Sequence, residues 1–353
     1  MSQRIAGFDL ARAIAMLVMV LVNFKVAMLS GAVPDSGFGL DLLDGRAAAV
    51  FVTLAGIGLS LLSATARLRG SVELQQQVRR QVRRRAAFLF LVGLGFVTVW
   101  PADILHYYGV MLALASLLLF WRGSLLLGLA LMVVLAFPFA LWLGVDYNAG
   151  WHWPSLTYPE FWSWAGFWRN LWLNGFHPIL PWFSFLLLGL WLGRLNWQHS
   201  AVQWRLLLAG AGLCLLAETL ARFCTDPLWS VWLGQMSPMP PLPLYMCSAM
   251  GSTLIWLVLA VKVASVYASH PLVQQLEHLG RLALTLYLTH ILLGLGILDA
   301  LGLLQQASLP LAVGSACAYL ILFGLFSVWH RRHFQSGPLE WCLRKVAGAT
   351  RSA

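Results

Sequence analysis

The sequence predicts an all-α, polytopic integral membrane bundle of about ten transmembrane helices, with both termini cytoplasmic. Hydrophobic residues make up 60% of the 353-residue chain and charged residues only 10%, whereas a soluble domain carries about 25% charged residues. Apolar runs of roughly 17–25 residues, the length that crosses a bilayer core, recur along the chain. These runs lack the period-two alternation of a barrel strand, and a membrane-spanning backbone must satisfy its hydrogen bonds internally. Helices are therefore the expected elements.

The expected helices follow these apolar runs in chain order. They cover residues 7–30, 46–66, 86–101, 107–121, 124–145, 178–196, 203–222, 244–266, 282–303 and 310–330. No linker divides them, so residues 1–353 are expected to form a single transmembrane domain. Two segments lie outside the runs, a tryptophan-rich connection at 146–177 and a basic tail at 331–353.

Basic residues alternate between successive connections and indicate how the helices are oriented. Five arginines in residues 79–85 follow the second expected helix, and Arg331 and Arg332 follow the last one. Acidic residues such as Asp103 and Asp146 occupy the opposite connections. Because cytoplasmic loops are enriched in Lys and Arg, the tail is expected in the cytoplasm and the 146–177 connection outside. The net charge of +10 is attributed to topology and lipid headgroups, and no nucleic-acid partner is expected.

The 146–177 connection is dense in indole side chains. Six tryptophans occur in it: Trp151, Trp153, Trp162, Trp164, Trp168 and Trp172. Indoles favour the headgroup layer, so one interpretation is an interfacial helix. A second interpretation, compatible with the first, is a lid over a sugar or lipid, since carbohydrates stack on aromatic faces.

Ionisable residues inside a membrane are costly and are therefore functional candidates. In the first expected helix, Asp9 and Arg12 have the i,i+3 spacing that lets them pair on one face. Asn23 lies eleven residues beyond Arg12, close to three turns, and so shares that face. The pair is either a structural clamp or part of a site where Arg12 binds a phosphate.

Two carboxylates precede the second expected helix. Asp41 and Asp44 are followed at once by Arg46 in DGRAAAVFVTLAG. Carboxylates are favoured at the positive end of a helix, so capping is one interpretation and substrate binding the other. Gly56 and Gly58 in this helix predict close packing against a neighbouring helix.

Three histidines lie in or near the expected spans. Asp103 and His106 have i,i+3 spacing in PADILHYYGV, beside Tyr107, and a carboxylate that orients an imidazole is what general-base catalysis needs. His177 opens the sixth expected helix, and Arg194 closes it. His290 lies near the middle of the ninth, where a lone histidine more often bonds to a neighbouring helix than acts in catalysis. No residues have the spacing of a metal site, and no HExxH, GxSxG or Walker pattern occurs.

These segments resemble the YeiB-like bacterial membrane proteins and the related heparan-α-glucosaminide N-acetyltransferase family. The matching segments are RIAGFDLARAIAMLVMVLVNF, DGRAAAVFVTLAG, DILHYYGV, FHPILPWFSFLLLGLWLGR and GRLALTLYLTH, in that order, from about residue 4 to 295. The resemblance implies a bacterial cytoplasmic (inner) membrane protein. It also implies an acyltransferase that moves an acyl group, such as acetyl, from cytosolic acyl-CoA to an extracytoplasmic glycan or lipid acceptor.

The chain departs from its relatives at their proposed catalytic histidines. Membrane acyltransferases that acylate glycans carry Arg, ten residues and then His in the first helix, and here Asn23 ends that spacing. The acetyltransferase branch places its histidine before the second helix, where this chain has Asp41 and Asp44. His106, oriented by Asp103, is therefore the favoured base, with His177 and His290 as alternatives.

The remaining roles follow from this mechanism. Asn23 would bond the thioester carbonyl as an oxyanion hole does. Arg12, Arg194 or Arg281 would bind the CoA phosphates. Two other classes stay open: a transporter for a small or lipid-linked substrate, and a non-enzymatic membrane scaffold.

Overall fold

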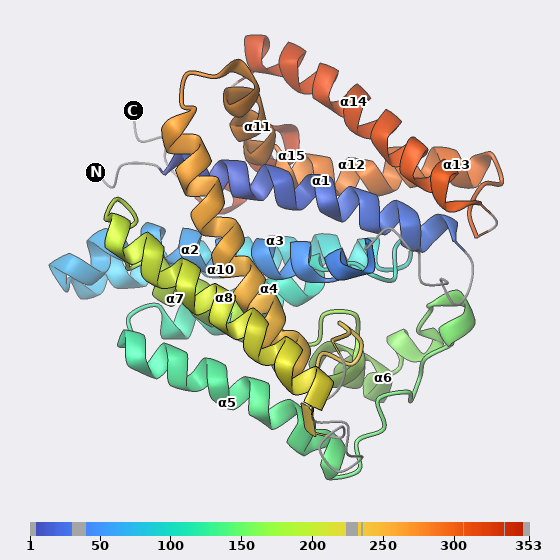
Figure 1. Ribbon diagram of the computed structural model, residues 1–353, viewed down its shortest axis with the longest axis horizontal. Coiled ribbons are helices and arrows are strands. Elements are labelled where there is room, and N and C mark those ends of the chain that lie inside the picture. Colours follow the sequence, from blue (N-terminus) through green and yellow to red (C-terminus); the bar gives the residue numbers. More distant parts are fainter. Residues whose placement is uncertain are drawn as a thin grey trace. The chain divides into compact units, whose positions relative to one another are not determined.

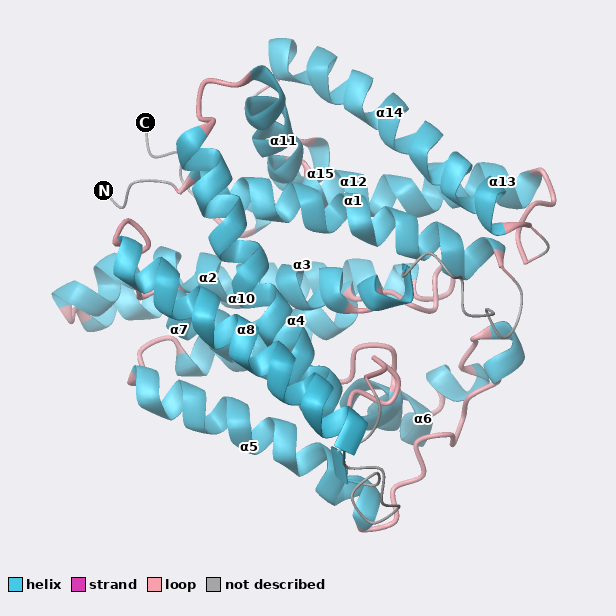
Figure 2. Cartoon of the chain, viewed as in Figure 1, coloured by secondary structure: helices cyan, strands magenta, loops and turns pink. Residues whose placement is uncertain are grey.

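The structure is a computed structural model that describes residues 5–29, 40–223, 232–233, 236–305, 307–334 and 336–348. Apart from two isolated β-bridges, the regular elements in these ranges are helices, which confirms the predicted all-α class (Figures 1 and 2). Two compact units share the chain, and each is described by itself. Unit 1 comprises Met1–Phe51, Trp153–Leu156 and Trp256–Cys342. Unit 2 comprises Val52–His152, Thr157–Ile255 and Leu343–Ala353.

Unit 1 is organised around α1 (Ala6–Met28), which contacts α11, α12 and α14. Glycines permit the closest approaches, because a Cβ on Gly7 would meet Val261 and one on Gly280 would meet the Asp9 carbonyl. The elements of this unit after α1 are η1 (Leu40–Leu43), η2 (Trp153–Ser155), α11 (Pro271–Arg281), α12 (Ala283–Thr289), η5 (His290–Leu295), α13 (Gly296–Ala300) and α14 (Leu309–His333).

A π-helical turn interrupts the ninth expected helix. Residues His290–Leu295 form η5, so one apolar run of the sequence is divided into α12, this turn and α13. Gly294 in the turn faces Phe24 of α1 and Tyr319 of α14, where a Cβ would lie 2.8 Å and 3.2 Å from their rings. The turn therefore packs tightly against two other helices of unit 1.

The expected basic tail contains a helix. Helix α15 (Pro338–Val346) carries Glu340, whose carboxylate accepts hydrogen bonds from the backbone N–H groups of Leu284 (2.7 Å) and Thr285 (2.9 Å). These N–H groups belong to the first turn of α12, where backbone N–H groups have no partner within their own helix. Glu340 therefore caps α12, and the tail is part of the folded unit.

Unit 2 contains most of α2 (Arg46–Arg69) and the first half of α10 (Pro243–Val266). Helix α3 packs along α4, α5 along α7, and α4 along α7. Its other elements are α3 (Val72–Phe96), α4 (Leu105–Leu118), α5 (Gly123–Trp142), η3 (Pro159–Trp162), α6 (Trp164–Arg169), η4 (Asn170–Asn174), α7 (Ile179–Leu192) and α8 (Ser200–Phe223).

Helix α3 begins well before the expected residue 86. It starts at Val72, and the hydroxyl of Ser71 accepts a hydrogen bond from the Leu74 N–H at 3.4 Å. The five arginines of residues 79–85, which were expected in a connection, are thus helical. Apolar runs did not reveal this segment because it is polar, but Arg and Gln are good helix formers.

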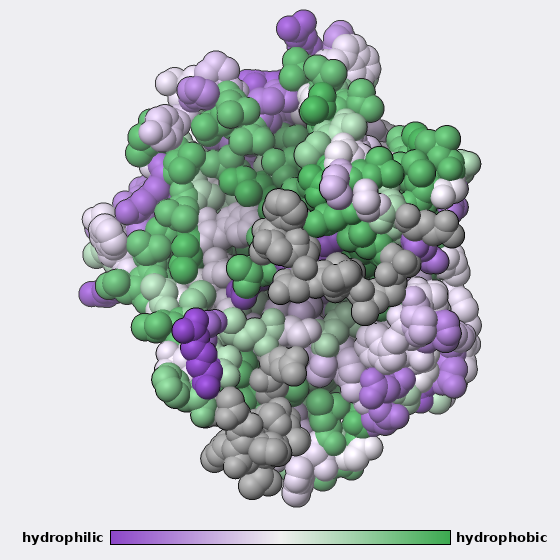
Figure 3. Space-filling model, turned by 45° about the vertical axis from the view of Figure 1, so that its right-hand side comes forward, coloured by the Kyte–Doolittle hydropathy of each residue, from purple (hydrophilic) through white to green (hydrophobic). Residues whose placement is uncertain are grey.

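Seven described helices are long and apolar enough to cross a membrane. An eighth candidate is a bent pair, Trp164–Asn174 with Ile179–Leu192, whose axes differ by 48°. All ten expected runs are helical, but α3 is too polar and α4 too short for this criterion. Apolar side chains cover much of the face in Figure 3, as expected for a surface in contact with lipid. The orientation of the termini stays a prediction.

Substituting Gly56 is expected to destabilise unit 2 strongly. A Cβ on Gly56 of α2 would overlap the Leu186 carbonyl of α7, and one on Gly189 would overlap the Thr53 carbonyl. Neither backbone can move without separating the helices. Gly56→Leu should therefore lower the free energy of unfolding by about 1–3 kcal/mol or more. Thermal unfolding of the detergent-solubilised protein measures the loss.

The matched control is Gly58→Leu on the same helix. No atom lies within 4 Å of a Cβ built on Gly58, so this change should leave the melting temperature nearly unaltered. The structure corrects the expectation that both glycines mediate packing, because Gly58 is exposed. Equal losses in the two variants would contradict the close α2–α7 contact.

Two buried histidines lie between α11 and α14 in unit 1. His278 and His330 are 4% and 3% exposed, and their ring centroids are 5.8 Å apart. Burial, and then the charge of Arg281 with the neighbouring His330 and Arg331, lowers the pKa of His278 from 6.5 to about 4. His278 is thus neutral in the folded protein at pH values where the unfolded chain is protonated. Its contribution to stability is complete above about pH 6.5 and is lost as the pH falls towards 4.

Acidification should therefore destabilise the protein less when His278 is replaced by glutamine. Melting temperatures at pH 7.5, 6.0 and 4.5 test this, with His199→Gln, an exposed histidine, as the control. The wild type and the control should lose more stability than His278→Gln over this range. The same loss in all three proteins would show that His278 does not carry the pH dependence.

Candidate functional site

A carboxylate–imidazole pair is buried at the start of α4 in unit 2. Asp103 and His106 are both 0% exposed. One oxygen of Asp103, Oδ2, lies 3.0 Å from His106 Nδ1 and also accepts the His106 backbone N–H at 3.2 Å. A carboxylate only accepts hydrogen bonds, so in a neutral His106 imidazole the proton lies on Nδ1 and the lone pair on Nε2. The predicted pairing at i,i+3 spacing is present.

The second ring nitrogen of His106 lacks a hydrogen-bond partner among the described residues. His106 Nε2 is buried and forms no hydrogen bond within the described part of the chain. The imidazole lies against Tyr107, with centroids 3.9 Å apart, and edge-on to Phe161 at 5.6 Å. A buried nitrogen lone pair without a donor is costly, and such groups are common where a ligand supplies the missing partner. His106 is therefore placed to accept a proton from a bound group.

Helix α3 fixes the position of this pair through Gly93. A Cβ there would overlap the His106 backbone nitrogen and lie 2.8 Å from Asp103 Oδ2. The absent side chain lets α3 reach the first turn of α4, and any larger residue would displace the imidazole. The sequence motif did not reveal this residue, since a glycine in an apolar helix has many other uses.

Tyr107 and His177 lie beside the pair. The Tyr107 hydroxyl donates to Asn170 Oδ1 at 2.5 Å, and the Tyr107 and His177 ring centroids are 6.1 Å apart. His177 Nδ1 is a second buried ring nitrogen without a hydrogen-bond partner among the described residues. The Asp103–His106 cluster is defined here as Asp103, His106, Tyr107, Asn170 and His177, all within unit 2.

The tryptophan-rich segment supports the cluster with polar bonds. The Asn174 amide donates to the carbonyls of Tyr147 (3.0 Å) and Ala149 (2.8 Å), and its oxygen accepts from Tyr158 at 3.1 Å. The Trp151 indole donates to the Asn174 carbonyl at 2.6 Å. Of residues 146–177, expected as an interfacial helix or a lid, those of unit 2 form short helices beside the cluster, where Phe161 meets the His106 ring edge-on at 5.6 Å.

Asn23 and His290 form a separate pair in unit 1. Asn23 Nδ2 lies 2.9 Å from His290 Nε2, and His290 Nδ1 lies 3.2 Å from the Leu286 carbonyl. His290 is 0% exposed. The prediction that His290 bonds to a neighbouring helix is confirmed. Asn23, predicted to bond a thioester carbonyl, faces an imidazole instead.

The structure gives Asp41 and Asp44 a partner that was missed from the sequence. Lys25 Nζ in α1 lies 2.9 Å from Asp41 Oδ1 and 2.8 Å from Asp44 Oδ1. The Lys25 side chain is only 3% exposed. A lysine within an apolar run is itself a signal of a buried ion pair. The two carboxylates thus act as counter-charges for Lys25 in this structure.

The other predicted ligand-binding cations are placed as follows. Arg12 pairs with Asp9 at 2.9 Å, as the i,i+3 spacing predicted. Arg194 donates to the carbonyls of Trp121 (2.6 Å) and Leu119 (3.2 Å), which are free at the end of α4. It therefore binds backbone in this structure. Arg46 is the first residue of α2.

The fold and the buried pair define a polytopic helical membrane protein with a candidate acid–base centre. Residues 4–207, more than half of the chain, match the family described as heparan-alpha-glucosaminide N-acetyltransferase, catalytic, and the chain belongs to that family. Residues 190–350 match a second family, described as protein of unknown function (DUF418). Together the matches confirm the predicted resemblance to YeiB-like proteins and their acetyltransferase relatives. Among the curated proteins no sequence matches this chain significantly.

Proposed function

We propose that the protein is a membrane acyltransferase that moves an acyl group, such as acetyl, from acyl-CoA to an extracytoplasmic glycan or lipid. The observation that carries this proposal is the buried Asp103–His106 pair, whose Nε2 has no partner among the described residues. The family match supports the same class of reaction. The proposed setting is the cytoplasmic (inner) membrane of a bacterium, which the apolar spans support.

In the proposed reaction His106 moves one proton. Nε2 takes the proton from an acceptor hydroxyl or amine, whose oxygen or nitrogen attacks the thioester carbonyl. The C–S bond then breaks, and the CoA sulfur leaves with the proton that His106 returns. Asp103 orients the ring through Nδ1 and stabilises the imidazolium formed during the step.

Neighbouring groups supply positioning. Tyr107 is fixed by Asn170, so its ring forms one wall beside the imidazole. The His177 ring lies 6.1 Å from the Tyr107 ring, and its Nδ1 lacks a hydrogen-bond partner in the described part of the chain, so His177 is the second candidate for binding the acceptor. The exposed indoles of Trp162 (63%) and Trp164 (81%) offer flat faces on which a sugar acceptor can stack.

The test uses purified protein in liposomes with [¹⁴C]acetyl-CoA and an extract of membrane glycans and lipids. The proposal expects transfer of label to an extract component with release of one CoA thiol for each acetyl group. Saturable binding of acetyl-CoA, measured by calorimetry, should accompany it. A folded, helical protein that neither binds acetyl-CoA nor releases thiol would refute the proposal.

A second candidate function, transport of a small or lipid-linked substrate, is favoured by one observation. The pair Trp164–Asn174 and Ile179–Leu192 forms a broken span, and broken helices are frequent at the binding sites of transporters. Movement of label across the liposome membrane without thiol release would support transport. Thiol release coupled to acetylation supports the transferase.

A further inference from the structure

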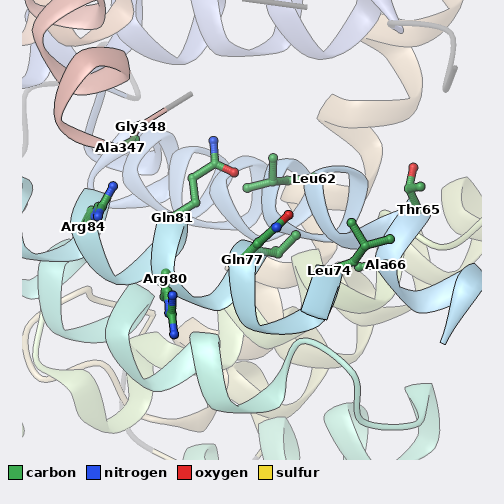
Figure 4. A pocket seen from close by; sticks show the side chains of 11 residues that line it. Leu62, Thr65, Ala66, Leu74, Gln77, Arg80, Gln81, Arg84, Ala347 and Gly348 are labelled. Carbon is green, nitrogen blue, oxygen red and sulfur yellow. The ribbon is translucent and has the colours of Figure 1, made fainter. Parts of the chain in front are cut away.

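A basic pocket lies between α2 and α3 in unit 2, apart from the Asp103–His106 cluster. Its volume is about 510 Å³. Figure 4 shows α2 and α3 on its two sides, with the backbone that follows α15 at one end. The lining residues from α2 are Leu62, Thr65 and Ala66; those from α3 are Leu74, Gln77, Val78, Arg80, Gln81 and Arg84; and Ala347 and Gly348 complete it.

Spacing along α3 places the polar residues of this pocket together. Gln77, Gln81 and Arg84 are separated by four and three residues, and Arg80 follows Gln77 by three, so they are neighbours on the helix surface. In Figure 4 Arg84 and Gln81 extend to the side on which Ala347 and Gly348 lie. A Cβ on Gly348 would be 2.7 Å from Arg84 Nη1. The absence of a side chain at Gly348 therefore leaves space for the Arg84 guanidinium.

The positive charge of this region is not paired with carboxylates in the part of unit 2 that the structure describes. None of the five arginines in residues 79–85 forms an ion pair with a described carboxylate. Arg79 lies over the Phe120 ring at 5.3 Å, and Arg83 donates to the Ser116 hydroxyl at 3.3 Å, so both bind to neutral groups. Burial, and then the charge of Arg344, lower the pKa of Arg85. An anion is the missing component.

We propose that this pocket binds a phosphate group, with Arg84 and Arg80 as its cationic ligands and Gln77 and Gln81 as neutral donors. Guanidinium groups suit phosphate because two parallel N–H donors match two phosphate oxygens. The apolar wall from Leu62, Ala66 and Leu74 suits a ligand that continues as an acyl chain or a pantetheine arm. Two sources have this chemistry, an anionic phospholipid headgroup and the phosphates of CoA.

The experiment titrates the full-length protein, in uncharged maltoside micelles at low salt, with two probes. One probe is CoA and the other is dioctanoyl-phosphatidylglycerol. At least one should bind saturably, and its Kd should rise about tenfold or more in Arg80→Gln/Arg84→Gln, which removes two charge-assisted contacts. Binding of CoA identifies the phosphates of a nucleotide as the ligand, and binding of the lipid identifies a headgroup.

The control pair is Arg122→Gln/Arg205→Gln, two exposed arginines that do not line the pocket. The Kd of this pair should stay within about twofold of the wild type, because neither arginine lines the pocket or contacts a ligand bound in it. Equal weakening in both pairs, or no binding of either probe, would overturn the proposal. The acyl-transfer proposal is tested separately, because release of the CoA thiol with transfer of label would keep it standing after either result.

A third variant keeps the test informative if the double substitution fails to fold. Gln81→Glu places a carboxylate three residues before Arg84, where it can pair with that guanidinium. It should weaken probe binding about as much as the double substitution and raise the melting temperature in the absence of ligand. Unchanged binding in a folded Gln81→Glu protein would also count against a phosphate site.

Discussion

The substitution His106→Gln should reduce acetyl transfer by about 10²–10⁴-fold, the usual contribution of a positioned acid–base group. Glutamine preserves much of the ring's volume and polarity but cannot take up a proton, so binding of acetyl-CoA should change little. Asp103→Asn should also lower the rate, because an amide can hold the imidazole in the wrong tautomer. The measurement is the initial rate of thiol release with acceptor present, together with the Kd for acetyl-CoA.

The matched control for this prediction is His199→Gln, in which an exposed histidine of unit 2 is replaced. Its rate should equal that of the wild type. If His106→Gln keeps full activity while His177→Gln loses it, the base is His177 and the assignment of His106 is wrong. Loss in all three variants with normal folding would point to a requirement for histidine outside the cluster.

Replacing Lys25 with methionine is expected to destabilise the protein by about 2–4 kcal/mol. Removing one partner of a fully buried ion pair costs roughly 3–5 kcal/mol, because the other charge stays buried. The expected loss is somewhat smaller here, since the side chains of Asp41 and Asp44 retain 43% and 29% of their exposure. Unfolding by SDS titration in mixed micelles, followed by far-UV circular dichroism, measures the change.

A double variant separates the ion pair from the packing of the lysine stem. Lys25→Met/Asp44→Asn removes one uncompensated carboxylate and should recover at least about 1 kcal/mol relative to Lys25→Met. Asp44→Asn alone should cost less than Lys25→Met, because Asp41 still pairs with the lysine at 2.9 Å. Failure of the second substitution to restore any stability would show that the loss came from packing.

Local patterns predicted the helices and the short-range pairs. Each of the ten expected apolar runs falls on described helix, although α6, α11 and α15 lie outside these runs. The i,i+3 spacing predicted the Asp9–Arg12 and Asp103–His106 contacts. Both kinds of signal depend only on residues a few positions apart. The start of α3 at Val72 was missed because a polar helix carries no hydropathy signal.

Contacts between segments that are far apart in the sequence could not be predicted from the sequence. Asn23 and His290 are 267 residues apart, and nothing in either local pattern indicates the other. Arg194 was predicted from the sequence as a phosphate ligand. In the fold it donates instead to backbone carbonyls of residues 73 and 75 positions away. Gly93 and Lys25 acquire their roles only when a neighbouring segment packs against them. The candidate centre was thus predicted, but most of its supporting residues were not.

The π-helical turn at His290–Leu295 has an implication for how the chain tolerates insertions and deletions. Such a turn holds one more residue than an α-helical turn, and each residue in a helix advances the direction of the side chains by about 100°. The wider turn absorbs this advance, so deleting one residue between Ile291 and Leu295 would allow a continuous α-helix whose later residues keep their present directions. The turn can therefore lose one residue without changing the face that α12 or α13 presents to its neighbours.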